Sequence, residues 1–383
     1  MRRRHRRRAS RVAVVTGTRA EYGLLQSVMR AVREEPSLRL QIVAAGMHLL
    51  RKFGYTVDRI RRDGWRIDAC VRMQAGSDNP LDQAAGLSRG VAGVARFLQQ
   101  AQTDIVLVLG DRIEAMAGAL AAVTTGRVLA HIHGGDVAPG DFDDPLRHAI
   151  TKLSHIHFVA TRSSMRRVVR MGEEPQRVHL VGGPGLDRLY ELVRRSPPDR
   201  VRTGTALVVH HAYGRPAAAE ERVMSDLLKA VASVGLRRLV VYPNSDRGHG
   251  GVIRAIQRHR RDGDSGSVEV VRSLPRDDFL RSLMEADVLV GNSSSGIIEA
   301  APAGTASVNV GLRQVGRQRA GPSVVEADES FDSIRGAILI ARRKRPKPGR
   351  PTVYGDGQSG PRIARILADT EPTPGLRRKR MTY

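Results

Sequence analysis

The fold is decided by the stretch Leu107-Val108-Leu109-Gly110-Asp111-Arg112-Ile113-Glu114, in which a short apolar run passes straight into charged side chains. The same pattern returns a little further along the chain, in His131-Ile132-His133-Gly134-Gly135-Asp136. A parallel α/β sheet carries its chemistry at the carboxyl ends of its strands. Two such ends, close together in the sequence, predict neighbouring strands that open onto one cleft.

Apolar β-branched runs alternate with amphipathic segments of helical length around this stretch. In the first half, the predicted strands are Val12–Thr16, Leu40–Ala45, Asp104–Leu109, Val128–Ile132, Ile156–Ala160 and Val178–Val181. The helix candidates between them are Leu24–Arg33, Gln83–Gln100, Ile113–Val123, Pro145–Leu153 and Ser164–Met171. This alternation predicts a parallel sheet covered on both faces.

Glycine and proline interrupt the alternation at 181–185 and at 195–199, and it then restarts. The second set of predicted strands is Ala206–His210, Leu239–Tyr242, Val268–Val271, Val288–Val290 and Ser307–Val310. We therefore expect an N-terminal domain over 11–184, a C-terminal domain over 185–355, a helix within 356–370 that returns to the first domain, and basic tails at 1–10 and 371–383. Two Rossmann-like domains facing each other across a central cleft resemble the GT-B architecture of nucleotide-sugar enzymes.

The 383 residues are too many for one ordinary core, and their formal net charge is +24. Segments 1–11, 342–350 and 377–380 contain seven, six and four Lys or Arg and no acid, which together account for 17 of these charges. Such runs are typically solvated, so the charge argues only weakly for nucleic acid. An aromatic content of 4% also disfavours a nucleic-acid binder.

No apolar run reaches the length of a membrane span, and Val12–Val15 is too short for the core of a secretion signal. The single cysteine, Cys70, fits a reducing compartment. We expect a cytoplasmic protein that does not insert into membranes. The chain has neither Gly-x-Gly-x-x-Gly after its first strand nor Gly-Lys-Ser/Thr, which disfavours dinucleotide and Walker-type nucleotide sites.

Anion-binding groups follow the first predicted strand. Gly17 and Thr18 permit a tight turn, and the helix that follows presents free N–H groups to an anion. Arg19 can clamp a phosphate there, or it can pair with Glu21 at the surface.

Asp111 and Arg112 stand where the next predicted strand reaches solvent. Asp111 can act as or orient a general base while Arg112 offsets phosphate charge. The alternative is a helix N-cap aspartate with a surface arginine.

The region from 131 to 157 is crowded with imidazoles and carboxylates: His131, His133, Asp136, Asp141, Asp143, Asp144, Arg147, His148, His155 and His157. A metal site is the rival reading of such ligand types. We favour a proton-transfer cluster in which imidazole and carboxylate groups perturb each other's pKa, and we expect no metal. His155 and His157 lie at a helix-to-strand junction and are expected to be structural.

The second half carries Val209-His210-His211, then Tyr242-Pro243-Asn244, and then Gly291-Asn292-Ser293-Ser294-Ser295-Gly296 between a strand and a helix. Hydroxyl and backbone N–H groups at such a helix start can surround a phosphate. Glu299, one turn along the same helix, can accept two ribose hydroxyls. Serine-rich loops are often only turns, but His211 and Arg313 are expected to converge on this one.

The motifs taken together closely resemble the hydrolysing UDP-N-acetylglucosamine 2-epimerases, which start sialic-acid synthesis. The resemblance runs from about Val12 to about Asp328. Its motifs are Thr-Gly-Thr-Arg-Ala-Glu-Tyr-Gly (16–23), Ala-Gly-Met-His-Leu (45–49), Gly-Asp-Arg-Ile-Glu-Ala (110–115), His-Ile-His-Gly-Gly-Asp (131–136), Asp-Asp-Pro-Leu-Arg-His-Ala-Ile-Thr-Lys-Leu-Ser-His (143–155), Gly-Asn-Ser-Ser-Ser-Gly (291–296) and Asn-Val-Gly-Leu-Arg-Gln-Val-Gly-Arg (309–317).

The resemblance implies a GT-B fold, no cofactor, and release of UDP with inversion at sugar C2 through a glycal-like alkene, giving free N-acetylmannosamine. It places catalytic roles on Asp111, His133, Asp136, Asp143 and Arg147. It places UDP binding on Arg19, Arg112, His211, Asn244, Ser293, Ser294, Glu299 and Arg313. Family members commonly self-associate, so a homo-oligomer is expected.

Several alternatives stay open. A non-hydrolysing 2-epimerase would return UDP-N-acetylmannosamine, but that branch usually has Glu-Ala-Gly where this chain has His133-Gly134-Gly135. A hydrolysing epimerase of a di-N-acetylbacillosamine nucleotide shares the same motifs. A GT-B glycosyltransferase would need an acceptor pocket.

Overall fold

The computed structural model describes residues 8–76, 80–137, 143–197, 203–244, 246–261, 268–272, 274–380 and 382. The chain divides into two compact units. Unit 1 comprises 1–136, 143–187 and 358–383, and unit 2 comprises 137–142 and 188–357. In the described part of the chain, no helix is long and apolar enough to cross a membrane.

Unit 1 is built on a seven-stranded sheet whose strand order is β3-β2-β1-β4-β5-β6-β7, with every neighbouring pair parallel. Its strands are β1 (Ser10–Thr16), β2 (Leu38–Ala45), β3 (Ala69–Val71), β4 (Ile105–Leu109), β5 (Val128–Ile132), β6 (Ile156–Val159) and β7 (Val178–Leu180). Its helices are α1 (Arg19–Glu34), α2 (Val57–Arg62), α3 (Pro80–Gln100), α4 (Ile113–Thr124), α5 (Asp143–Leu153), α6 (Arg162–Arg170), α14 (Ser359–Asp369) and α15 (Pro374–Arg377), and α7 (Gly185–Arg195) begins in it.

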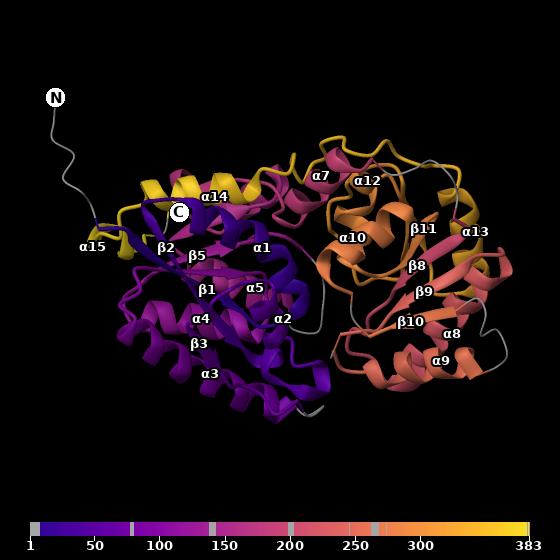
Figure 1. The fold of residues 1–383 in the computed structure, drawn as a ribbon, viewed down its shortest axis with the longest axis horizontal. Coiled ribbons are helices and arrows are strands. Elements are labelled where there is room, and N and C mark those ends of the chain that lie inside the picture. The colour runs from indigo at the N-terminus through magenta and orange to yellow at the C-terminus, as the bar shows by residue number, and fades with distance from the viewer. Residues whose placement is uncertain are drawn as a thin grey trace. The chain divides into compact units, whose positions relative to one another are not determined.

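Both faces of this sheet are buried, which explains why its strands are continuous apolar runs. Val12 and Val14 of β1 pack into one core with α1 and α14, whereas Ala13 and Val15 pack into another core with α3 and α4. Figure 1 shows the yellow helix α14 lying along α1. Ile363 of α14 is fully buried there, so the chain returns to unit 1 after completing unit 2.

Unit 2 repeats the arrangement with a six-stranded parallel sheet of order β10-β9-β8-β11-β12-β13. Its strands are β8 (Thr205–Val209), β9 (Arg237–Val241), β10 (Val268–Val271), β11 (Val288–Gly291), β12 (Ala306–Val310) and β13 (Val324–Ala327). Its helices are α8 (Ala217–Ser233), α9 (His249–Arg261), α10 (Arg276–Glu285), α11 (Ser294–Ile298), α12 (Ala300–Ala303) and α13 (Phe331–Ala341).

In each sheet, the order in which successive strands are added reverses once. The reversal lies between β1 and β4 in unit 1 and between β8 and β11 in unit 2. Ligands of open α/β sheets bind at such switch points, outside the carboxyl ends of the strands. The predicted residues Arg19 and Asp111 follow β1 and β4, and His211 and Ser293 follow β8 and β11. The α/β fold class of two Rossmann-like units is confirmed.

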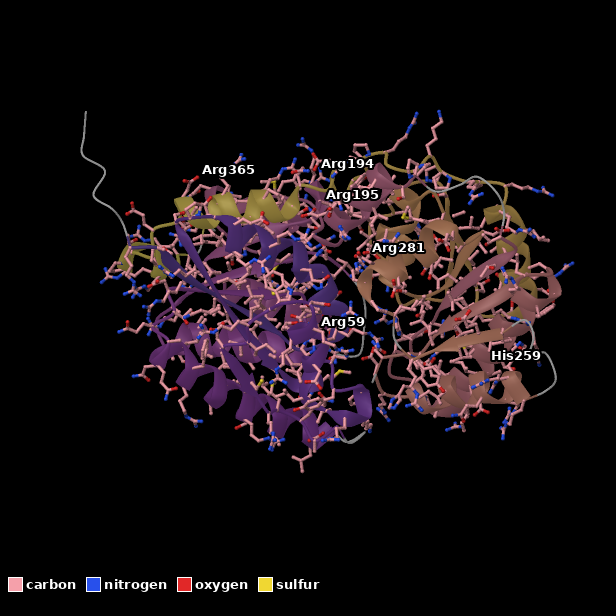
Figure 2. The ribbon with its side chains drawn as sticks, viewed as in Figure 1. Arg59, Arg194, Arg195, His259, Arg281 and Arg365 are labelled. Carbon is pink, nitrogen blue, oxygen red and sulfur yellow. The ribbon has the colours of Figure 1, made fainter. Side chains whose placement is uncertain are left out.

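Exposed arginines also lie outside the three basic segments. Exposed arginines such as Arg194, Arg281 and Arg365 project from ordered helices (Figure 2). Most described residues after 370 are exposed, but the segment is not wholly without structure, because α15 forms there and Lys379 is hydrogen-bonded to the end of α5. Composition could not show this, because the partners of Lys379, which are backbone carbonyls of α5 and the Glu173 carboxylate, come together only in the folded chain.

Candidate active site

The turn between β1 and α1 is closed by a capping box. The Thr18 hydroxyl accepts a hydrogen bond from the Glu21 amide at 3.3 Å, and the Glu21 carboxylate accepts one from the Gly17 amide at 2.8 Å. Glu21 is only 5% exposed. The alternative of an Arg19–Glu21 pair at the surface is therefore wrong, because the Glu21 carboxylate is buried. Burial raises the pKa of Glu21 to about 8. Arg19 is half-buried at the first position of α1, and burial lowers its pKa.

A second buried carboxylate, Glu114 on α4, lies beside this turn. It is fully buried and accepts a hydrogen bond from Gln74 Nε2 at 2.9 Å, and its Oε2 lies 3.5 Å from Arg112 Nε. A Cβ added to Gly17 would lie 2.6 Å from Glu114 Cδ, so glycine is needed there. The packing role of Glu114 was missed by sequence reasoning, although an acid in the Ala-rich stretch 113–122 was a signal for it.

Asp111 is paired with an arginine of α5. Its carboxylate forms an ion pair with Arg147, whose side chain is only 3% exposed and also approaches Asp144 Oδ1 at 3.6 Å. Arg112, not Asp111, occupies the N-cap position of α4, so the capping alternative for Asp111 is wrong. Asp143 is half-buried at the first position of α5, one turn before Arg147. The structure thus joins the tip of β4 to the first turns of α5.

His133 and Asp136 form a hydrogen-bonded pair at the tip of β5. The strand ends at Ile132, and His133 adopts φ +65, a left-handed conformation that is rare for a side-chain-bearing residue. Its Nδ1 lies 2.9 Å from Asp136 Oδ2, while Asp136 Oδ1 accepts a hydrogen bond from Ser164 Oγ at 2.7 Å. A carboxylate that accepts on both oxygens requires the proton on Nδ1, which leaves Nε2 as the basic nitrogen.

The other imidazoles of this region have structural partners. His131 lies within β5, with Nε2 2.7 Å from Gly110 O and Nδ1 3.2 Å from Thr151 Oγ1, and burial lowers its pKa to about 3. His155 Nδ1 accepts from the Leu129 amide, and His157 Nε2 lies 3.0 Å from Glu173. The expected structural roles of His155 and His157 are confirmed. Asp141 lies outside the described residues.

Among the residues that the structure describes, no group of three or more His, Cys, Asp or Glu side chains is arranged to hold a metal ion. His131 and His133 do not share a ligand set, because the strand ends between them.

In unit 2, His211 and Asn292 bridge the switch point. The His211 amide donates to Asn292 Oδ1 at 2.8 Å, and Asn292 Nδ2 donates back to His211 O at 2.7 Å. The Asn244 amide donates to His211 Nδ1 at 3.2 Å, which places the imidazole proton on Nε2 as a hydrogen-bond donor. These hydrogen bonds hold together the carboxyl ends of β8, β9 and β11. Asn292 was not among the site residues predicted from the sequence.

Arg313 approaches the same strand tips. Its guanidinium donates to Asn292 O at 3.3 Å and lies 3.6 Å from Asp246, which also accepts from Asn244 Nδ2. Ser293 caps α11, with its hydroxyl accepting from the Ser295 amide, and Ser294 is half-buried at the first helical position. Hydroxyl, guanidinium and imidazole donors therefore gather at the carboxyl ends of β8 and β11.

Glu299 has a different setting from the one predicted. Helix α11 ends at Ile298, and Glu299 stands between it and α12 instead of continuing one helix. Its buried carboxylate forms an ion pair with Arg276 at the start of α10. No sequence pattern indicated this arginine, because an ion pair between residues of two separate elements depends on tertiary structure.

Comparison with known proteins gives a family match. The family model described as UDP-N-acetylglucosamine 2-epimerase matches residues 30–368. The chain is 34% identical over 367 residues to the UDP-N,N'-diacetylbacillosamine 2-epimerase (hydrolyzing) of Legionella pneumophila, covering 93% of this chain and 95% of the relative. It is 31% identical to the UDP-N-acetylglucosamine 2-epimerase of Neisseria meningitidis serogroup B, covering 87% and 88% of the two chains.

Solved structures show the same fold. The crystal structure of UDP-GlcNAc 2-epimerase from Neisseria meningitidis bound to UDP-GlcNAc matches with a TM-score of 0.74 at 14% identity, covering 94% of this chain and 100% of the other. The Methanocaldococcus jannaschii UDP-GlcNAc 2-epimerase in complex with UDP-GlcNAc and UDP matches with a TM-score of 0.75 at 16% identity and the same coverage.

Proposed function

Because the chain belongs to the UDP-N-acetylglucosamine 2-epimerase family, we propose that it is a hydrolysing epimerase that converts UDP-N-acetylglucosamine and water into N-acetylmannosamine and UDP. The observation that carries this proposal is the His133–Asp136–Ser164 hydrogen-bonded chain at the tip of β5. It supplies an oriented base in the unit that also holds the Asp111–Arg147 pair.

His133 Nε2 takes the C2 proton in this proposal. The C2–H bond is weakly acidic, so its electrons form the C1=C2 alkene while the C1–O bond to UDP breaks. Asp136 holds the imidazole in the basic tautomer and stabilises the imidazolium that forms, and Ser164 fixes Asp136.

Water then adds to the glycal. Its oxygen bonds to C1, and a carboxylic acid delivers a proton to C2 from the opposite ring face, which inverts that carbon. The resulting carboxylate takes the proton that the bound water loses, and His133 returns the proton taken from C2 to solvent. Asp111 and Asp143 are the candidate donors of the proton delivered to C2, with Arg147 orienting Asp111. The variant that lacks the true donor is expected to accumulate the glycal.

We assign UDP binding to the residues that the family resemblance names. His211, Asn244, Ser293, Ser294, Glu299 and Arg313 are the candidate contacts in unit 2, and Arg19 and Arg112 are those in unit 1. Helix α11 has only five residues, so the serine hydroxyls and Arg313, more than a helix dipole, are expected to balance the diphosphate. The departing UDP is thereby stabilised as its charge develops.

A second substrate is favoured by one observation. The Legionella pneumophila relative is named as a hydrolysing epimerase of UDP-N,N'-diacetylbacillosamine, and the match covers almost the whole of both chains. That sugar would undergo the same elimination and hydration at C1 and C2. The two substrates differ in sugar substituents, so kcat/KM measured on both decides between them.

The test is incubation of the purified protein with UDP-N-acetylglucosamine in D2O, followed by NMR and mass spectrometry. Free UDP and N-acetylmannosamine carrying deuterium at C2 are expected. UDP-N-acetylmannosamine as the final product would assign the chain to the non-hydrolysing reaction, and an unlabelled sugar would refute proton abstraction from C2. A parallel reaction with UDP-N,N'-diacetylbacillosamine uses the same readout.

We also propose that the enzyme acts in the cytoplasm as a homo-oligomer and needs no added cofactor. The single cysteine and the family resemblance support this proposal. Turnover that persists after exhaustive chelation, and a mass above 41.9 kDa in analytical ultracentrifugation, are the expected results.

A further inference from the structure

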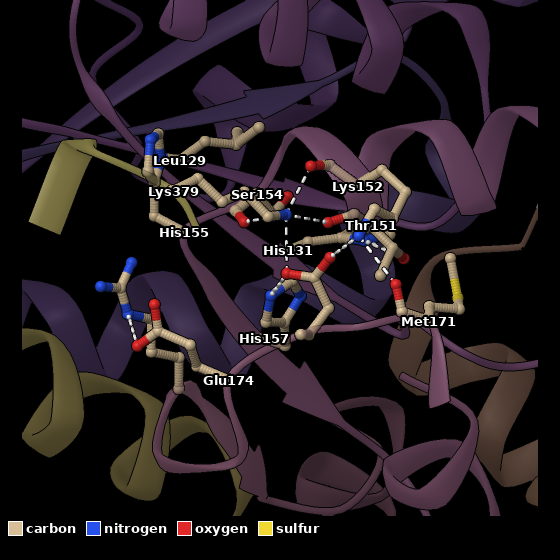
Figure 3. A network of polar contacts seen from close by, with 12 residues as sticks. Leu129, His131, Thr151, Lys152, Ser154, His155, His157, Met171, Glu174 and Lys379 are labelled. Carbon is tan, nitrogen blue, oxygen red and sulfur yellow. Dashed lines mark hydrogen bonds and ion pairs between the residues drawn. The ribbon is translucent and has the colours of Figure 1, made fainter. Parts of the chain in front are cut away.

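The C-terminal segment contributes one side chain to the end of α5. Lys379 Nζ donates hydrogen bonds to Thr151 O at 3.2 Å, to Ser154 O at 2.8 Å and to Lys152 O, as Figure 3 shows. The last carbonyls of a helix have no partner within it and carry the negative end of its dipole. The three N–H donors of the ammonium group are shared among these three carbonyls and one carboxylate, that of Glu173.

Lys379 is itself held by a buried carboxylate. Its Nζ lies 2.6 Å from Glu173 Oε2, and Glu173 also accepts from Lys152 at 2.7 Å and contacts His157 at 3.0 Å. Burial alone would raise the pKa of Glu173, but the hydrogen bonds from His157, Lys152 and Lys379 hold it at about 2. Glu173 therefore stays ionised and fixes the ammonium group over the helix end.

The segment is anchored on both sides of Lys379. Leu376 O accepts from Arg177 Nη1 at 3.0 Å, and the Thr382 amide donates to Gly172 O at 3.2 Å. Arg380, the next basic residue, is exposed. The contacts thus select Lys379 from a run of four basic residues that composition alone cannot distinguish.

The same helix α5 carries site residues at its other end. Asp143 and Arg147 occupy its first turns, and Arg147 pairs with Asp111. In its last turn, Thr151 Oγ1 contacts His131 Nδ1, and His131 Nε2 contacts Gly110 O, immediately before Asp111. Two routes of direct contact therefore link the helix that Lys379 holds to the Asp111 carboxylate.

We propose that Lys379 is a positioning residue for the active site, acting through α5 to hold Arg147 and Asp111 in register. The predicted effect of Lys379 on turnover rests on the proposed function, whereas its predicted effect on the order of α5 does not. Lys379 touches no reacting atom in this role.

The test compares Lys379→Met with Arg380→Met in the full chain. Both variants remove one positive charge from the same segment, but only the first removes the contacts to α5. Amide hydrogen exchange without substrate is expected to become about tenfold faster in the last turns of α5 and near Gly110 in Lys379→Met, the size expected for losing a hydrogen-bonded cation at a helix end. Arg380→Met should exchange like the unaltered protein.

Turnover gives the second readout. We expect kcat of Lys379→Met to fall by about tenfold or more while KM and UDP affinity change less than about twofold, because the candidate UDP contacts lie mainly in unit 2. Exchange and kcat equal to those of Arg380→Met would overturn the proposal. Uniformly faster exchange across unit 1 would also overturn it, since Lys379 would then be a general stabiliser.

If Lys379→Met does not fold, a milder variant at the same position can be tested instead. Lys379→Arg keeps the charge but spreads it over a planar group that cannot meet the same three carbonyls. Faster exchange confined to α5 supports the proposal, and unchanged exchange refutes it. If the unaltered protein turns over no nucleotide sugar, the proposed function fails, while the exchange results still decide whether Lys379 positions α5.

Discussion

Asp136→Asn is the sharpest perturbation of the proposed base. The change keeps the size of the side chain but replaces a carboxylate that accepts on both oxygens, from His133 Nδ1 at 2.9 Å and from Ser164 Oγ at 2.7 Å. The asparagine has one accepting oxygen and one donating NH2 group. If the oxygen faces His133, the NH2 group faces Ser164, whose hydroxyl must then accept a hydrogen bond; if the oxygen faces Ser164, the NH2 group faces the imidazole. In the second arrangement His133 Nδ1 becomes an acceptor, and Nε2 becomes protonated and cannot act as a base.

The expected loss follows from the tautomer and the missing charge. Removing the charged partner of a catalytic imidazole costs about 10³- to 10⁴-fold in kcat, or about 4–5.5 kcal/mol of barrier. The fold should lose much less, about 1–2 kcal/mol, because one hydrogen bond is weakened without opening a cavity. The ratio of these two losses separates a chemical role from a packing role.

The assay is UDP release at saturating substrate, together with chemical denaturation of the same preparations. Asp63→Asn is the matched control, because Asp63 is another unit 1 carboxylate that accepts two hydrogen bonds, from Tyr22 and Gln26. It should leave kcat within about twofold of the unaltered protein. Asp136→Asn with more than about a tenth of normal kcat would refute the assignment of His133 as the oriented base.

Three further outcomes test the surrounding structure. Gly17→Ala places a Cβ 2.6 Å from Glu114 Cδ, so the free energy of unfolding in a urea titration should fall by about 1–3 kcal/mol, and an unchanged midpoint would contradict the packing of Glu114. Burial raises the pKa of Glu21 from its ordinary value of 4.5 to about 8, so the contribution of the protonated Glu21 carboxyl to stability is complete below pH 4.5 and is lost as the pH rises through about 8. Glu21→Gln should therefore flatten the stability–pH curve in that window, and an unaltered slope would argue against a buried protonated carboxyl. Arg313→Met should weaken UDP binding about tenfold by calorimetry and change kcat less than KM, whereas unchanged affinity would remove Arg313 from the nucleotide site.

The sequence located the central strands well because they are buried on both faces. The predicted strand Val128–Ile132 coincides with β5, and the predicted strand Val288–Val290 lies within β11. The strands it missed, β3 and β13, lie at sheet edges. β3 has only three residues, and β13 carries the polar Glu326 within four, so neither shows the apolar run that identified the others.

The sequence predicted those site residues that come directly after a strand. Asp111 and His133 could be placed because each comes directly after an apolar run. Ser164, which donates to Asp136, and Arg276, which pairs with Glu299, could not be placed, since they come from other elements and meet their partners only in the folded chain. Glu299 was misplaced because an uninterrupted helix was assumed across a junction that the structure breaks.

The left-handed backbone conformation of residue 133 sets the stability of the fold against the catalytic activity that we propose for His133. A residue at φ +65 is accommodated most easily by glycine, and an imidazole held there carries a conformational cost. Laboratory selection for heat resistance alone would therefore favour replacing this histidine, and the survivors would be robust but inert. Stabilising substitutions in this protein therefore have to be made at positions other than 133.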